Sequence, residues 1–265
     1  MKKTIFYIFS SLFFLLPALM LAVKSFTPVW KWGEPLSFEW TLRGWEVFLM
    51  DPRIYEALFV STLIALAVTF LNLLVGFLAG KALSHSVFKG KGLLETLLLL
   101  PLFIPTMAAA LGLHITMIRL GLANQWLGVV IVHLVPTIPY TIKVMKAGYD
   151  RIGSGMIQQA KVLGGSPFHV FRSVELPLLM PSVRSAVFLT VTISMSQYVL
   201  TAVIGGGNVI TLPIIYYPFL QSVNDTVMAA FSIAFAMLPV IAVAAVELLS
   251  KILTYKGTFV NRGVT

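Results

Sequence analysis

The chain has 265 residues, of which 58% are hydrophobic and 11% charged, and it contains no cysteine. An average soluble domain holds about 45–50% apolar and about 25% charged residues, so the composition indicates a membrane protein. Without cysteine there are no disulfides, thiol nucleophiles or cysteine-ligated metals. As a separate expectation, this chain binds no metal and no cofactor. The net charge of +9 must be interpreted from the placement of the charges relative to the membrane.

Six apolar stretches are long enough to cross a bilayer. A hydrocarbon core about 30 Å thick needs roughly 20 mostly apolar residues per helix, and only structures that bond their own backbone groups can cross it. The predicted spans cover about residues 5–23, 57–79, 93–113, 126–142, 183–204 and 227–250. We therefore predict an all-α polytopic membrane protein with six transmembrane helices, forming a single domain over residues 1–265.

The placement of Lys and Arg residues orients these spans. Short loops rich in these residues stay in the cytoplasm. With both termini cytoplasmic, all but five of the 19 Lys and Arg residues lie on the cytoplasmic side. The exceptions are Lys24, Lys31, Arg43, Arg53 and Arg119. This topology places a long loop, about residues 143–182, in the cytoplasm.

The sequence of this loop predicts two short helices. Ser154 can cap a first helix, and Gly164 can end it, because glycine adopts the left-handed conformation that closes many helices. Ser166 with Pro167 is a typical start for a second helix. Pro177 is expected to bound that second helix, since a residue before proline is disfavoured in the α conformation.

The first short helix carries an apolar face. At about 100° per residue one face collects Met156, Ile157, Ala160 and Leu163, while Gln158 and Lys161 lie opposite. Helices this short are unstable alone. They must pack either on the ends of their own spans or on another protein.

The loop resembles the EAA loop of permease subunits of binding-protein-dependent ABC importers of the type I fold. That pattern is Glu-Ala-Ala, three residues, Gly, nine residues, Ile, one residue and Leu-Pro. The positions that match are Ala160, Gly164, Leu176 and Pro177, with Val174 in place of Ile. Gln158 and Gln159 depart from the Glu and the first Ala, so an ion pair of the ATPase with residue 158 is not expected.

The resemblance implies a partner for the loop and a place in an assembly. The first short helix would be a coupling helix that contacts a separate ATPase through Gln158, Gln159, Ala160, Lys161, Val162, Gly164, Leu176 and Pro177. The implied partners are two ATP-binding subunits carrying ATP and Mg, a second copy or homologous permease, and an extracytoplasmic solute-binding protein. The implied location is the bacterial inner membrane, among lipid and without nucleic acid. A loop packed only on its own protein is the alternative.

The chain lacks a phosphate-binding loop of its own. A P-loop reads G-x-x-x-x-G-K-[ST]. At Gly80-Lys81 and Gly90-Lys91 the first glycine is replaced by Val75 or His85, and the hydroxyl residue by Ala82 or Gly92. We therefore predict a transport subunit that is not an enzyme, with ATP hydrolysis on a partner.

Polar residues within spans are costly and are candidates for a translocation pathway. Asn72, Ser194, Gln197 and Tyr198 form this set. Helix-to-helix hydrogen bonding is the alternative for Asn72 and Ser194. For His133 we expect a buried structural hydrogen bond rather than a metal, because no second ligand stands at helical spacing.

The segment Thr211-Leu212-Pro213 is similar to the corresponding segment of polyamine, thiamine and ferric-ion type permeases. This similarity suggests a small organic cation or ferric ion as solute.

Two other functions stay open from the sequence. One is an ion-coupled secondary transporter, which would carry charged residues at mid-membrane and an inverted repeat. The other is a membrane scaffold.

Overall fold

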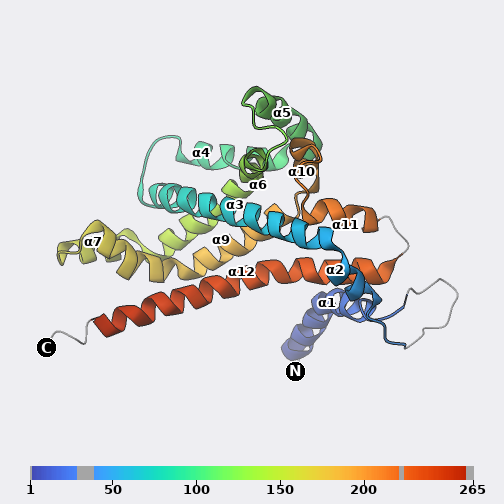
Figure 1. Ribbon diagram of the computed structural model, residues 1–265. Coiled ribbons are helices and arrows are strands. Elements are labelled where there is room, and N and C mark those ends of the chain that lie inside the picture. The colour runs from blue at the N-terminus through green and yellow to red at the C-terminus, as the bar shows by residue number, and fades with distance from the viewer. Residues whose placement is uncertain (1, 29–38, 221–223, 261–265) are drawn as a thin grey trace. The chain divides into compact units, whose positions relative to one another are not determined.

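The computed structural model describes residues 2–28, 39–220 and 224–260, so Lys31 lies outside the described residues. These residues form helices and no strand (Figure 1), which confirms the predicted all-α class. The chain divides into two compact units, Met1–Ser61 with Ile210–Met237 and Thr62–Val209 with Leu238–Thr265. We describe each unit by itself.

The first unit is held together by contacts between segments distant in sequence. Its helices are α1 (Lys2–Lys24), α2 (Arg43–Met50), the start of α3 (Pro52–His85), α11 (Leu212–Leu220) and the start of α12 (Asp225–Val260). Lys24 Nζ lies 2.7 Å from Asp225 Oδ2, and the Phe231 ring packs edge-on against Phe48 at 5.0 Å between centroids. These contacts join α1 and α2 to α12.

The start of α3 is stabilised by a capping carboxylate, Asp51, and by a proline at the first helical position, Pro52. The Asp51 carboxylate accepts a hydrogen bond from the backbone N–H of Arg53 at 3.0 Å, and proline is well suited to the first helical position. The Arg53 guanidinium also donates to this carboxylate at 3.0 Å. Together these hydrogen bonds hold the pKa of Asp51 below its ordinary value.

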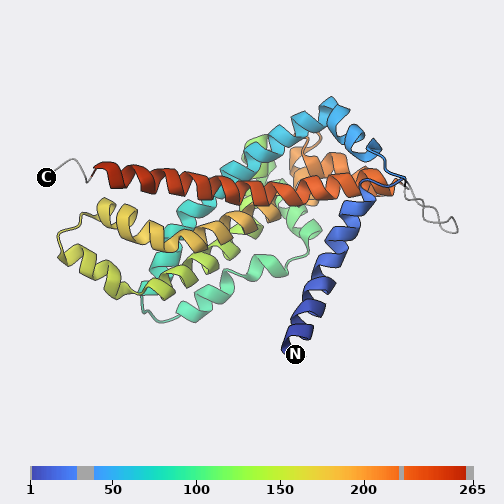
Figure 2. The same cartoon turned by 90° about the horizontal axis from the view of Figure 1, so that it is seen from below.

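The second unit contains the functional elements. It comprises the rest of α3, α4 (Lys91–Leu97), the 3₁₀ segment η1 (Leu100–Phe103), α5 (Thr106–Arg119), α6 (Trp126–Ile152), α7 (Ser154–Val162), α8 (Pro167–Val170), the π-helical segment η2 (Phe171–Glu175), α9 (Leu176–Met195), α10 (Tyr198–Gly205) and the end of α12. Within it α6 and α9 run side by side (Figures 1 and 2).

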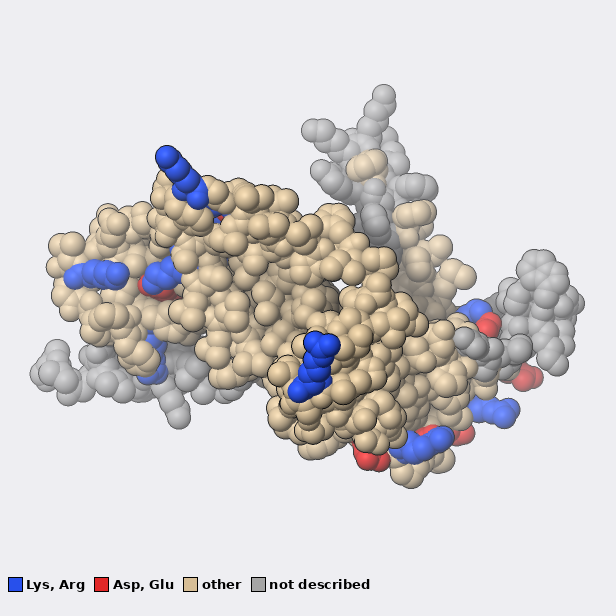
Figure 3. Space-filling model, turned by 90° about the horizontal axis from the view of Figure 1, so that it is seen from above, with Lys and Arg blue, Asp and Glu red and all other residues tan. Residues whose placement is uncertain are grey.

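Several helices are long and apolar enough to cross a membrane. Four of them qualify among the described residues: α3, α6, the continuous helix Pro167–Met195, and α12 over Asp225–Leu248. A fifth span would be the bent pair Lys91–Phe103 and Thr106–Arg119. The face drawn in Figure 3 is mostly uncharged, with Lys, Arg, Asp and Glu as scattered groups. The first predicted span, 5–23, falls on α1. The described apolar part of α1 is the shorter segment Leu15–Lys24, so six spans and cytoplasmic termini remain predictions.

The third predicted span, 93–113, is wrong as a continuous helix. The chain bends by 98° between the η1 and α5 segments. Ile104 is extended there, with φ −81° and ψ 129°, because it precedes Pro105. Pro101 and Pro105 also lack the N–H groups that an unbroken helix would use.

The fifth predicted span, 183–204, also differs from the structure. α9 ends at Met195, and α10 begins at Tyr198 after a break at Ser196 and Gln197. The Ser196 hydroxyl donates to the Ile193 carbonyl at 2.9 Å, and the Thr201 hydroxyl donates to the Gln197 carbonyl at 2.6 Å. These two hydroxyls therefore bond to backbone carbonyls on either side of the break.

Small residues bring α6 close to both of its neighbours. A Cβ on Gly80 would lie 2.9 Å from the Lys146 backbone nitrogen, and one on Gly76 would lie 2.7 Å from Thr141 Cγ2. Gly76 and Gly80 form the small-xxx-small spacing that lets membrane helices approach closely. On the other side, a Cβ on Gly148 would collide with Ser182 of α9. α6 is therefore packed tightly between α3 and α9.

We predict that Gly80→Ala destabilises the protein by about 1–3 kcal/mol, because the added methyl must displace the backbone of α6. Thermal unfolding of the purified protein in detergent measures this change. Gly112→Ala is the matched control, since a Cβ at Gly112 of α5 meets nothing within 4 Å. Equal melting temperatures for the two variants would contradict the close approach of α3 and α6.

Candidate functional site

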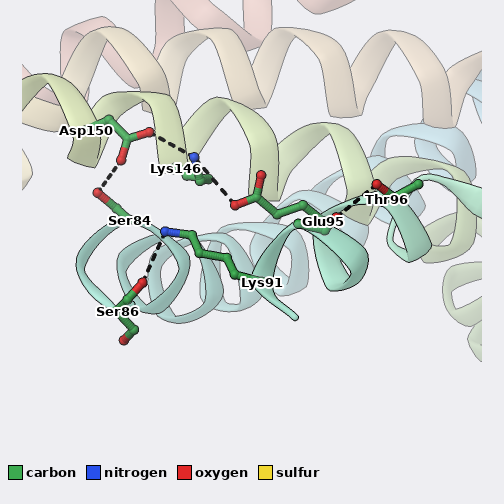
Figure 4. A network of polar contacts seen from close by, with 8 residues as sticks. Ser84, Ser86, Lys91, Glu95, Thr96, Lys146 and Asp150 are labelled. Atoms are coloured by element: carbon green, nitrogen blue, oxygen red, sulfur yellow. Dashed lines mark hydrogen bonds and ion pairs between the residues drawn. The ribbon is translucent and has the colours of Figure 1, made fainter. Parts of the chain in front are cut away.

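The predicted cytoplasmic loop at 143–182 begins as part of a long helix. α6 continues ten residues beyond the predicted end of the fourth span and stops at Ile152, where Gly153 has φ +72°. The end of α6 is fixed by polar contacts to α3 and α4 (Figure 4). Lys146 Nζ lies 3.1 Å from Asp150 Oδ2 and 3.6 Å from Glu95 Oε1, and Ser84 Oγ donates to Asp150 Oδ1 at 2.6 Å. The loop therefore follows a helix end that an ion pair to α4 and a hydrogen bond to α3 hold in place.

The first short helix of the loop, α7, ends where the sequence predicts. Gly164 has φ +86°. Its N–H donates to the Lys161 carbonyl at 3.0 Å, and the Gly165 N–H donates to the Ala160 carbonyl at 3.1 Å. This pair of bonds is the Schellman closure of a helix. The predicted cap at Ser154 is wrong, since Gly153 precedes the helix and Ser154 is its first residue.

The predicted apolar face of α7 is only partly turned inward. Ile157 is buried and Ala160 is half-buried, whereas Met156 and Leu163 are exposed, Leu163 by 88%. Val162 is exposed by 87%. Gln158, Gln159 and Lys161 are exposed as well, so most of the predicted coupling residues on α7 are accessible to a partner.

The second short helix differs from its prediction at its far end. Ser166 caps α8, because its hydroxyl accepts from the His169 N–H at 3.3 Å, which confirms the predicted start. Pro177 does not end the helix. The chain passes through the π-helical segment η2 into α9, and the Leu176 N–H bonds to the Phe171 carbonyl. The wider π turn accommodates a proline that an α-helix would resist. Leu176 is half-buried and Pro177 exposed.

The pathway candidates fall into two groups. Asn72 and Ser194 are buried and bonded within the unit: Asn72 Nδ2 donates to Thr137 Oγ1 at 2.8 Å, and Ser194 Oγ lies 3.0 Å from His133 Nδ1. Thr201 Oγ1 lies 3.0 Å from His133 Nε2, so both ring nitrogens have hydroxyl partners and the expected structural hydrogen bond is confirmed. Among the described residues no group of three or more His, Cys, Asp or Glu could hold a metal ion.

Gln197 and Tyr198 lie at the break between α9 and α10. A cavity of about 110 Å³ opens beside Gln197. It is lined by Pro101, Leu102, Ile104, Thr106, Ala109, Val135, Pro136, Gln197 and Leu200. The break of the third span, the Pro136 region of α6 and the break after α9 therefore meet at one place. Among the lining residues, Gln197 carries an amide and Thr106 a hydroxyl, and the others are apolar. Tyr198 is half-buried and is not among the lining residues.

Sequence reasoning missed the polar anchor of the loop. Glu175 is 2% exposed and lies 2.5 Å from Lys81 Nζ, and Tyr149 Oη donates to its second oxygen at 3.3 Å. One signal was available: after Asp150, Glu175 is the only acidic residue of the predicted loop.

Comparison with known proteins places most of the chain in one family. The family model of binding-protein-dependent transport system inner membrane components matches residues 72–254. The permease protein PhnV of Salmonella typhimurium, whose name provisionally assigns it to 2-aminoethylphosphonate transport, is 28% identical over 92% of each chain. The spermidine/putrescine transport system permease protein PotC of Escherichia coli is 24% identical over 89% of each chain.

Solved structures of a bacterial ABC transporter that imports the acidic polysaccharide alginate share the fold. One chain aligns with a TM-score of 0.65 at 16% identity, over 93% of this chain and 94% of that one. A second structure, in complex with an alginate pentasaccharide-bound periplasmic protein, aligns with a TM-score of 0.61 at 14% identity, over 96% of this chain and 93% of that one.

Proposed function

Because the chain belongs to the family of binding-protein-dependent transport system inner membrane components, we propose that it lines a solute pathway while α7 docks on a separate ATP-hydrolysing subunit. Permease subunits of this family lie in the inner membrane and serve ABC importers. In the proposed assembly, two ATPase subunits, a second permease and an external solute-binding protein join this chain. ATP binding closes the ATPase pair, the coupling helices move, and the permeases turn from inward-facing to outward-facing.

The exposed apolar side chains of α7 and its surroundings carry this proposal. Val162, Leu163 and Phe168 are exposed by 87%, 88% and 72%, although they belong to a loop whose other surface residues include Gln158 and Lys161. An apolar cluster rimmed by polar groups is typical of a protein interaction site. Packing and hydrogen bonding would dominate the contact, since Gln158 is a neutral amide.

We predict that Gly164→Pro abolishes most solute uptake. Proline fixes φ near −65°, whereas Gly164 has φ +86°, so the Schellman closure of α7 is lost. A cost of about 1–3 kcal/mol for an incompatible backbone conformation corresponds to a roughly 5- to 150-fold smaller population of docking-competent loop. Uptake into proteoliposomes and co-purification of the ATPase subunit measure the effect.

Gly164→Asn is the control at the same position, because asparagine tolerates the left-handed conformation better than other side chains. It should retain uptake and ATPase co-purification. Full uptake by Gly164→Pro would show that α7 does not need its observed end to dock.

The cavity beside Gln197 is the proposed place of solute contact. It lies where two spans are broken, and irregular backbone at membrane depth is tolerated where it lines a cavity. Asn72 and Ser194 are less suited to this role, because their side chains are bonded to Thr137 and His133 in the interior. We therefore place the pathway at Gln197, with Tyr198 next to it.

We predict that Gln197→Ala lowers uptake roughly tenfold, the effect of losing a hydrogen bond worth about 1–1.5 kcal/mol. ATPase co-purification should be unchanged, which separates a pathway defect from an assembly defect. Ser196→Ala is the control, since the Ser196 side chain is exposed and its described hydrogen bond goes to the Ile193 carbonyl of α9. Equal uptake by both variants would remove Gln197 from the pathway.

The solute is proposed to be a small molecule with a primary amine. The names of two relatives point to 2-aminoethylphosphonate and to spermidine and putrescine, and all three compounds carry an amine that is protonated at neutral pH. Thiamine and ferric ion, suggested by the Thr211-Leu212-Pro213 segment, are the competing solutes.

We predict that cells lacking this chain lose uptake of at least one of these three radiolabelled amines, and that the wild-type chain restores it. Thiamine and ferric ion serve as comparison solutes in the same cells. Restored uptake of thiamine or iron with no change for any amine would overturn the proposed solute class without affecting the assignment as a permease.

A further inference from the structure

Glu175 is a buried carboxylate in the coupling loop. Its neighbours Arg172 and Ser173 on η2 are exposed, whereas Glu175 is 2% exposed. Burying a charge is costly unless the charge is paired and hydrogen-bonded. In the EAA-like pattern, residue 175 is the one unspecified position between Val174 and Leu176-Pro177, so the pattern assigns it no role.

The two carboxylate oxygens of Glu175 are bonded to two different helices. Oε1 lies 2.5 Å from Lys81 Nζ of α3, and Oε2 accepts from Tyr149 Oη of α6 at 3.3 Å. Lys81 Nζ also lies 5.9 Å from the centroid of the Tyr149 ring. One side chain of the coupling loop thus joins three segments of the second unit.

A second contact fixes the position of η2 along α3. The rings of Phe171 and Phe77 pack edge-on, with their centroids 5.3 Å apart. Phe77 and Lys81 are four residues apart on α3, and Phe171 and Glu175 are four residues apart on η2. Residues at this spacing share a helix face, so an apolar contact and an ion pair follow one another along the same interface. Two such contacts restrict both sliding and rotation of η2 against α3.

Tight packing around Gly165 connects α7 to α8, which leads into η2. A Cβ on Gly165 would lie 2.8 Å from the Ala160 carbonyl oxygen and 2.8 Å from Val170 Cγ2. Ala160 belongs to α7 and Val170 to α8, so the two short helices have little room to move relative to each other. A displacement of α7 is therefore passed to α8 and η2.

We propose that Glu175 is a positioning residue that fastens the coupling helices to α3, so that movement of α7 reaches α3 directly through the Glu175–Lys81 ion pair. This inference rests on the proposed function, in which α7 follows the ATPase. Without the ion pair, α7 stays linked to the transmembrane helices through the chain on either side of it, α6 and η2 with α9, and through the Phe171–Phe77 contact. The connection to α3 is then weaker. ATP hydrolysis then continues, while the permease changes between its inward-facing and outward-facing states less often.

The test measures transported solute per ATP hydrolysed in proteoliposomes that contain the complete transporter and its binding protein. The uptake measurement uses whichever amine the wild-type complex transports. The variants are Glu175→Gln, Lys81→Met and the exchange of both charges, Glu175→Lys with Lys81→Glu. Arg53→Gln is the control, because it removes a surface ion pair with Asp51 outside the coupling region.

We expect Glu175→Gln and Lys81→Met to lower the ratio of solute to ATP at least about fivefold, the lower end of typical coupling between sites. The charge exchange should restore much of the ratio, and Arg53→Gln should leave it unchanged. A purely structural role would instead lower the yield of assembled complex and leave the ratio of the surviving complexes unaltered. An unaltered ratio in both single variants overturns the inference. Failure of the wild-type complex to couple uptake to ATP hydrolysis would instead reject the proposed function.

Discussion

The close packing of α6 between α3 and α9 is the constraint on which the second unit depends. Gly76 and Gly80 leave room for the α6 backbone on one side, and Gly148 leaves room for Ser182 on the other. In lipid there is no hydrophobic force between helices, so association depends on such close contact and on hydrogen bonds between helices. α6 is the element from which both the cavity and the coupling loop are positioned, because Pro136 lines the first and the helix end at Ile152 leads into the second.

The buried residues of α6 extend this packing in a regular way. His133, Thr137, Thr141, Met145 and Tyr149 follow one another at intervals of four and are all buried. Such residues form one stripe along the helix. Each polar member of the stripe bonds to a residue outside α6: His133 to Ser194 and Thr201, Thr137 to Asn72, Thr141 to Thr190, and Tyr149 to Glu175. Single bonds of this kind are worth about 0.6 kcal/mol on average in a membrane, so their combined effect is to fix the register of α6 rather than to supply most of its stability.

The parts of the molecule that sequence predicted are those with local causes. The end of α7 at Gly164 and the cap of α8 at Ser166 depend on residues within one turn, and both are found. The spans predicted from hydropathy did not include the helix breaks at Ile104–Pro105 and at Ser196–Gln197. Pro105 marks the first break in the sequence, whereas no proline marks the second. The passage through Pro177 was missed because a π turn is invisible in the sequence. The role of Glu175 was not predicted, since its partners lie 94 and 26 residues away. The Gly76 and Gly80 spacing could have been recognised from the sequence as a close-packing face.

The two ends of α6 differ in the kind of contact that surrounds them, and this difference fits the two tasks of a permease. Toward Ile152 the helix is tied by ionic groups, including Lys146 with Glu95 and Asp150, and by the bond from Tyr149 to Glu175. Around Pro136 it borders two broken spans and a cavity of about 110 Å³. Broken helices have fewer backbone bonds to lose, so rearrangement there costs less than at the tied end. A movement of α7 transmitted to the Ile152 end of α6 would therefore displace α3 and α6 together. The conformational change would be concentrated at the helix breaks next to Gln197.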